Sequence, residues 1–94
     1  MSNIFDENKN KVFGLNEGVF IGDENSEGKS YILFGDKIFE LKGSSCEILK
    51  VLEKRALTCE EFLSQLNSKF EELDEKSSSE FLNFCTENEI VVIS

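Results

Sequence analysis

The sequence predicts an α+β domain, a winged-helix-like arrangement in which three short antiparallel strands are followed by three helices. Apolar runs of strand length lie in the first 41 residues, and the second half repeats apolar residues at helical spacing. When the strands come first and the helices follow, the helices are expected to pack on one face of a small sheet. Three helices beside a hairpin also form the arrangement of a winged helix. A length of 94 residues fits one core. We expect a flexible polar tail over residues 1–10, where only Ile4 and Phe5 could dock, and a single domain over residues 11–94.

The strands are indicated by β-rich runs between turn residues. The first strand covers residues 19–21, between two glycines, and residues 12–15 are its partner or its lead-in. Residues 31–34 and 37–41 flank Gly35-Asp36, which predicts a two-residue hairpin turn because glycine readily takes a positive φ. That turn places Phe34 opposite Lys37, Leu33 opposite Ile38, Ile32 opposite Phe39 and Tyr31 opposite Glu40. Both faces of the hairpin are then substantially apolar, so burial of one face does not account for the pattern.

Three Ser/Thr-x-x-Glu capping boxes predict the helix starts. They run from Ser44 to Glu47, from Thr58 to Glu61 and from Ser77 to Glu80, and each satisfies free backbone donors at a helix N-terminus. Apolar residues at i, i+3 and i+4 follow each box and form one stripe per helix. The apolar run over residues 90–93 is a candidate closing strand.

Composition narrows the function classes. The net charge of −9 opposes binding to a phosphate backbone, which needs a basic surface. The chain has no histidine, and its three cysteines are widely spaced, so neither a metal site nor a Ser–His or Cys–His nucleophile pair is indicated. Neighbouring carboxylates such as Glu60 and Glu61 point apart on a helix. We therefore expect no catalysis, no metal and no cofactor.

The cellular location is predicted from the N-terminal segment and the length of the apolar runs. The N-terminus lacks a basic segment followed by an apolar one, and no apolar run approaches the roughly 18 residues that span a membrane. We expect a cytoplasmic protein with reduced thiols and no membrane partner.

Four segments together resemble a known family. They are residues 38–41, 44–52, 57–62 and 80–91, in which a strand ending in leucine precedes an Ile-Leu helix, a Thr-x-x-Glu helix and a Phe-Leu helix. This order is similar to that of the PqqD-like family, the peptide chaperones of pyrroloquinoline-quinone biosynthesis, which are also known as recognition elements for ribosomally made, modified peptides. The resemblance extends over roughly residues 18–93.

The resemblance implies a standalone peptide-binding adaptor. The leader segment of a precursor peptide would add as a strand beside the third strand, in a groove closed by the third helix, and would be presented to a modifying enzyme. Such enzymes include radical-SAM proteins, cyclodehydratases and leader peptidases. The expected peptide-binding residues are Lys37, Ile38, Phe39, Glu40, Leu41, Phe81, Phe84, Cys85 and Asn88.

The residues themselves support an exposed strand at this place. Residues 38–41 form the last strand before the helices, and an edge strand without proline and with few charges invites pairing. The alternative for Phe81 and Phe84 is a place in the core, with Ile38 packed on a neighbouring helix.

Two other functions share the predicted fold. A homodimerising scaffold would use the same edge strand on a second copy, so a monomer and a weak homodimer are both compatible with the sequence. A winged-helix DNA-binding domain would insert the third helix into the major groove, but residues 77–84 contain no Arg or Lys for phosphate or guanine.

Overall fold

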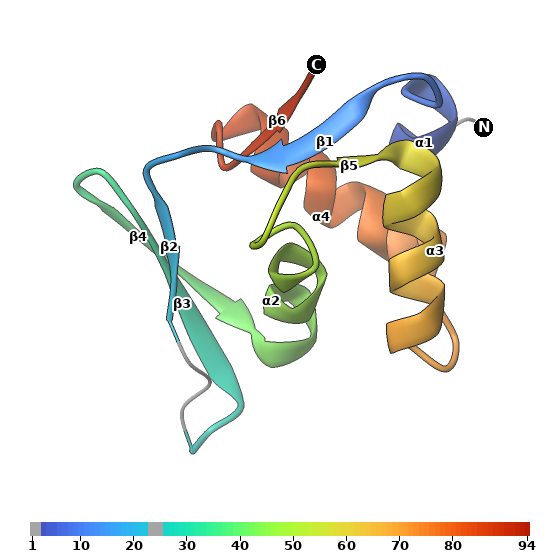
Figure 1. Ribbon diagram of the computed structural model, residues 1–94. Coiled ribbons are helices and arrows are strands. Elements are labelled where there is room, and N and C mark those ends of the chain that lie inside the picture. Colours follow the sequence, from blue (N-terminus) through green and yellow to red (C-terminus); the bar gives the residue numbers. More distant parts are fainter. Residues whose placement is uncertain (1–2, 23–25) are drawn as a thin grey trace.

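A computed structural model describes residues 3–22 and 26–94 of the chain, and it has an α+β fold. Its described part contains two small antiparallel sheets and four helices (Figure 1), so the predicted α+β class is confirmed and the predicted number of helices is wrong. The elements are α1 (Ile4–Glu7), β1 (Val12–Leu15), β2 (Val19–Ile21), β3 (Lys29–Phe34), β4 (Lys37–Lys42), α2 (Gly43–Lys50), β5 (Leu57–Thr58), α3 (Cys59–Lys69), α4 (Glu75–Glu87) and β6 (Val91–Ile93).

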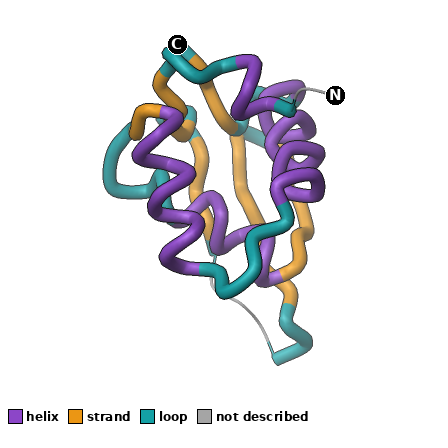
Figure 2. The backbone as a smooth tube through the Cα atoms, turned by 90° about the vertical axis from the view of Figure 1, so that its right-hand side faces the viewer, coloured by secondary structure: helices purple, strands orange, loops and turns teal. Residues whose placement is uncertain are grey.

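The strands belong to two separate sheets. The order of one is β2-β3-β4, and that of the other is β5-β1-β6. One face of the β2-β3-β4 sheet is covered by α2, which packs directly against it, and is reached by Phe84 of α4, whereas α3 lies beyond α2 (Figures 1 and 2). The division into two sheets differs from the single sheet that the sequence predicts, and a winged-helix layout is not confirmed.

The hairpin of β3 and β4 has the predicted register. Phe34 pairs with Lys37, and Ile32 pairs with Phe39, as a two-residue turn at Gly35-Asp36 requires. Gly35 has a φ of +63°, which a residue with a side chain adopts only at a cost. Local turn chemistry therefore determines this register.

The second sheet joins segments that are far apart in the sequence. β1 pairs with β6 near the C-terminus and with β5 just before α3. The prediction of a closing strand near residues 90–93 is thus confirmed. The suggestion that residues 12–15 pair with residues 19–21 is wrong, because β1 finds its partners in β5 and β6 instead.

One of the three predicted capping boxes is present. The Thr58 hydroxyl accepts from the backbone N–H of Glu61, and the Glu61 carboxylate accepts from the backbone N–H of Thr58. The other two helices begin earlier than predicted. Asp74 caps α4 by accepting from the Ser77 N–H at 3.1 Å, and α2 follows β4 directly, without a side-chain cap at Lys42. α4 begins earlier because Asp74 provides an N-cap upstream of Ser77. α2 begins earlier because β4 continues into it without a loop.

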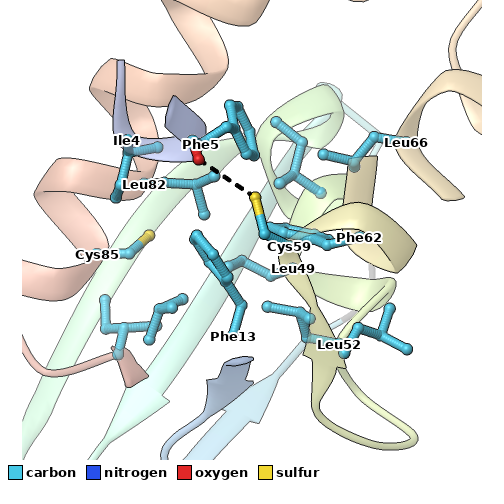
Figure 3. Packing of buried hydrophobic residues seen from close by; sticks show 14 of the residues in the cluster. Ile4, Phe5, Phe13, Leu49, Leu52, Cys59, Phe62, Leu66, Leu82 and Cys85 are labelled. Carbon is cyan, nitrogen blue, oxygen red and sulfur yellow. Dashed lines mark hydrogen bonds between the residues drawn. The ribbon is translucent and has the colours of Figure 1, made fainter. Parts of the chain in front are cut away.

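Two residues of the N-terminal segment belong to the core, and they are Ile4 and Phe5 of α1, the two side chains that the sequence indicated as able to dock. Ile4 and Phe5 are 3% and 1% exposed. Figure 3 shows both side chains packed among the buried hydrophobic residues. The Ile4 N–H donates to the Ser79 hydroxyl at 2.8 Å, and the Cys59 thiol donates to the Phe5 carbonyl at 3.4 Å. The sequence indicated the two apolar side chains that could dock, but not the polar contacts that hold them.

Candidate functional site

The open edge of β4 is the first part of the candidate site. β4 is the last strand in the order β2-β3-β4, and no strand in the described part of the chain pairs with its other edge. The Gly22 N–H donates to the Tyr31 carbonyl at 2.7 Å, so the peptide groups of Tyr31 point toward β2. The direction of the peptide groups alternates from one residue to the next along a strand, so those of Ile32 point toward β4 and pair with Phe39. By the same alternation along β4, the peptide groups of Ile38 and Glu40 point away from β3. These groups form a row of donors and acceptors available to another strand.

Two aromatic rings connect this edge to α4. The ring centroids of Phe39 and Phe84 are 5.8 Å apart at 87°, which is an edge-to-face contact. Phe39 is half-buried, whereas Phe84 leaves 38% of its surface exposed. The contact places an accessible aromatic side chain of α4 beside the open edge of β4.

A hollow of about 210 Å³ lies at the end of β4 where α2 begins. Ser44 and Ser45 line it directly after β4, and Phe81 lines it about one turn before Phe84. Its other lining residues come from α2, the α3–α4 connection and the start of α4, and they are Ile48, Phe70, Glu72, Leu73, Asp74, Ser77 and Ser78. The hollow and the edge therefore form neighbouring parts of one surface.

Several predicted site residues lie on or near this surface. Phe39 and Leu41 are half-buried on the inner face of β4, and Phe81 and Phe84 lie on the side of α4 described above. Lys37 is exposed beside the hairpin turn.

Three predicted residues have other surroundings. Ile38 is 69% exposed and shares the outer face of the sheet with Leu33, so it does not line the inner side of the edge. Glu40, also on that outer face, pairs with Lys29 at 3.0 Å. The Asn88 side chain donates to the Phe84 carbonyl at 2.8 Å and closes the end of α4.

Cys85 lies in the core rather than on the candidate surface. It is 0% exposed, and burial raises the pKa of its thiol to about 12. Its stripe on α4 also holds Leu82, which is equally buried, and this stripe faces the core. We therefore remove Cys85 from the candidate site, because a peptide at the edge of β4 could not reach it.

The sequence did not indicate the residues that form the hollow around Phe81. Phe70 and Leu73 lie just before and within the turn that precedes α4, and they come close to Ser44 and Ser45 only in the folded chain. Spacing along the sequence gives no signal for this proximity, because it depends on how α2 packs against α4 and the α3–α4 connection.

Acidic side chains lie at the rim of the hollow. Glu72 and Asp74 are both exposed, and no lysine or arginine is among the lining residues. The backbone N–H of Ser77 bonds to the Asp74 carboxylate and lowers the pKa of Asp74, with a further contribution from the Ser77 hydroxyl. Asp74 is therefore charged at neutral pH, and both ionisable side chains that line the hollow are acidic, with the charge of Lys76 acting on Asp74 from outside the lining.

The outer face of the β2-β3-β4 sheet is unusually apolar. Phe20 pairs with Leu33, and Leu33 pairs with Ile38, so the three side chains form a row across the three strands. Phe20 and Ile38 are 66% and 69% exposed. Contiguous exposed apolar side chains commonly mark surfaces that bind another molecule.

The described residues do not contain a group of three or more His, Cys, Asp or Glu side chains arranged to hold a metal ion. Nor does any helix in this part of the chain combine the length and apolarity needed to cross a membrane. Comparisons with protein families, with curated proteins and with solved structures found no match for this chain.

Proposed function

We propose that this protein is a peptide-binding adaptor that captures an extended segment of a precursor peptide on the open edge of β4. The observation that supports it is the exposed ring of Phe84, in edge-to-face contact with Phe39 beside an edge whose peptide groups have no strand partner among the described residues. Main-chain bonds from Ile38 and Glu40 would provide affinity, and apolar contacts with Phe84 would provide selectivity.

The adaptor presents the captured leader segment to a separate modifying enzyme. Radical-SAM proteins, cyclodehydratases and leader peptidases are the enzyme classes that the family resemblance suggests. The described residues provide a surface for holding a strand, and the sequence has no histidine for acid–base chemistry near it. We therefore assign binding to this chain and the reaction to its partner.

Amide NMR of the isotope-labelled full chain would test the proposal. The probes are synthetic peptides encoded by small open reading frames beside its gene, titrated to micromolar concentrations. We expect saturable shifts at residues 37–42 and near Phe84, and new protection of the Ile38 and Glu40 amides from solvent exchange. Shifts confined to other surfaces, or no shift with any peptide, would contradict strand addition at this edge.

A homodimer is the second candidate, and the exposed row of Phe20, Leu33 and Ile38 favours it. A second copy could cover this row or pair with the edge of β4. Sedimentation equilibrium over a hundredfold concentration range separates the two candidates. A mass that doubles with concentration, together with peptide titrations that shift nothing, would favour the dimer.

A further inference from the structure

The hollow beyond β4 has a defined position relative to a strand bound at the edge. β4 passes into α2 without an intervening loop, so Ser44 and Ser45 follow its last residue within two positions. A peptide paired along the six residues of β4 extends for about 20 Å. Its end beside Leu41 and Lys42 then arrives at the hollow.

The size of the hollow suits one side chain. Its volume is about 210 Å³. Pockets for complete small-molecule ligands are larger, at about 300–1,000 Å³. The apolar walls come from Ile48, Phe70, Leu73 and Phe81. A large aliphatic or aromatic side chain matches this volume and this lining.

The rim adds a charge preference. Glu72 is exposed, and no ion pair to it is present in the described part of the chain. Lys69, a nearby cation at the end of α3, is already bound to Glu47 at 2.7 Å. A carboxylate of this kind, next to an apolar hollow, attracts a ligand that has a lysine or arginine adjacent to its apolar anchor.

We infer that the hollow formed by Ser44, Phe70, Leu73 and Phe81 selects peptides in which a large apolar residue lies within two positions of a lysine or arginine, with Glu72 contacting the basic side chain. This inference rests on the proposed function, and it specifies the chemistry of the peptide segment that passes the end of β4.

A selection on the full-length chain tests the inference without knowledge of the natural peptide. The probe is a library of random 12-residue peptides displayed on their own mRNA, selected at low salt and then synthesised with a fluorescent label. We expect the enriched peptides to share a large apolar residue close to Lys or Arg. In a selected peptide, serine at the apolar position should weaken binding at least tenfold. Glutamate at the basic position should weaken it about threefold to tenfold.

Two charge-reversal variants provide the matched comparison. Glu72→Lys should weaken binding of the selected peptides by about threefold to tenfold. A peptide with Glu in place of its basic residue should bind Glu72→Lys more tightly than it binds the wild-type protein. Glu71→Lys has the same change of charge at an exposed neighbour that does not line the hollow, and it should change affinity by less than twofold. Circular dichroism of both variants checks that they fold.

The outcomes separate this inference from the proposed function. Selected peptides that shift the β4 amides but show no basic preference and the same affinity for Glu72→Lys would overturn the inference and leave the adaptor in place. A selection that yields no peptide able to shift those amides would overturn both.

Discussion

The ring of Phe39 on β4 meets the ring of Phe84 on α4 edge to face, with centroids 5.8 Å apart. The two residues are 45 positions apart in the sequence, and their contact brings α4 alongside the open edge of the hairpin. Aromatic pairs of this geometry contribute about 0.5–1.5 kcal/mol beyond the area that they bury. The pair thus links the stability of the fold to the surface on which we propose peptide binding.

Replacing Phe84 with alanine should separate these two roles. We expect Phe84→Ala to weaken peptide binding by about 1–3 kcal/mol if the ring is an anchor. Asn83→Ala, an exposed neighbour on the same helix, should leave affinity unchanged. Isothermal titration with a selected peptide measures both. Equal affinities for the two variants would remove Phe84 from the site.

The capping box of α3 should make stability depend on acid pH. The backbone N–H of Thr58 bonds to Glu61 and lowers the pKa of that carboxyl, and the side chain of Lys69 does the same for Glu47. A lowered pKa in the folded state means that the unfolded chain binds more protons, so this stabilisation is complete above about pH 5 and is lost as the pH falls through the folded values. Urea unfolding between pH 7 and pH 3 should show a falling midpoint below about pH 4.5.

Variants of the capping box assign part of that loss. Thr58→Ala should lower the free energy of unfolding by about 1 kcal/mol at pH 7. Glu61→Gln keeps a group able to accept the capping bond but removes the charge, so the fall below pH 4.5 should become shallower. Glu60→Gln, at the exposed neighbouring position, is the control. A wild-type acid profile for Glu61→Gln would show that the capping carboxylate is not responsible.

A buried hydroxyl on β3 should cost stability. Ser30 is 1% exposed, and its Oγ has no hydrogen-bond partner in the part of the chain that the structure describes. Ser30→Ala should therefore raise the free energy of unfolding by about 1 kcal/mol. Ser26→Ala, at an exposed turn, should change it by less than about 0.5 kcal/mol. Destabilisation by Ser30→Ala would mean that this hydroxyl makes a bond in solution.

The docking of α1 should be essential to the core. The Phe5 ring lies within 6.2 Å of the Phe13 ring and 6.1 Å of the Phe62 ring, measured between centroids. Phe5→Ala should cost about 3–5 kcal/mol, a large part of the stability of so small a domain. Asp6→Ala, exposed on the same helix, should change stability little. Unfolding in urea by circular dichroism measures both, and a small effect of Phe5→Ala would return α1 to the status of a loose tail.

The thiols offer an independent check on the orientation of α4. Cys46, Cys59 and Cys85 are all buried thiols that form no disulfide, and burial raises the pKa of Cys85 to about 12. Because the thiolate is the reactive form, iodoacetamide at pH 7.5 should modify none of them in the native protein and all of them in urea. Ser64→Cys adds an exposed thiol on α3 as a positive control. Rapid native labelling of Cys85 would place it on the surface after all.

The features that were predicted correctly from the sequence are local ones. The register of β3 and β4 follows from the two-residue turn at Gly35-Asp36, and the start of α3 follows from the bonds between Thr58 and Glu61. Each involves residues that are close together in the chain, so the same short-range geometry applies before and after folding. The open edge of β4 needs more than the hairpin, because it also requires that β1 pairs with β5 and β6 rather than with β4.

The tertiary structure decided which faces are buried. Phe81, Leu82, Phe84 and Cys85 all belong to one broad apolar region of α4, and helical spacing does not say which of them faces the core. α4 packs against α1, α2 and β6, and in this packing Leu82 and Cys85 are buried while Phe84 lies beside β4. The pairing of β1 with β5 and β6, and the meeting of Phe70 and Leu73 with the start of α2, likewise depend on packing between distant segments. The hydrophobic effect depends on the apolar area removed from water and not on the direction in which a side chain points. The sequence therefore determines which residues are apolar, and the packing of the whole chain determines which of them lie in the core and which at the candidate site.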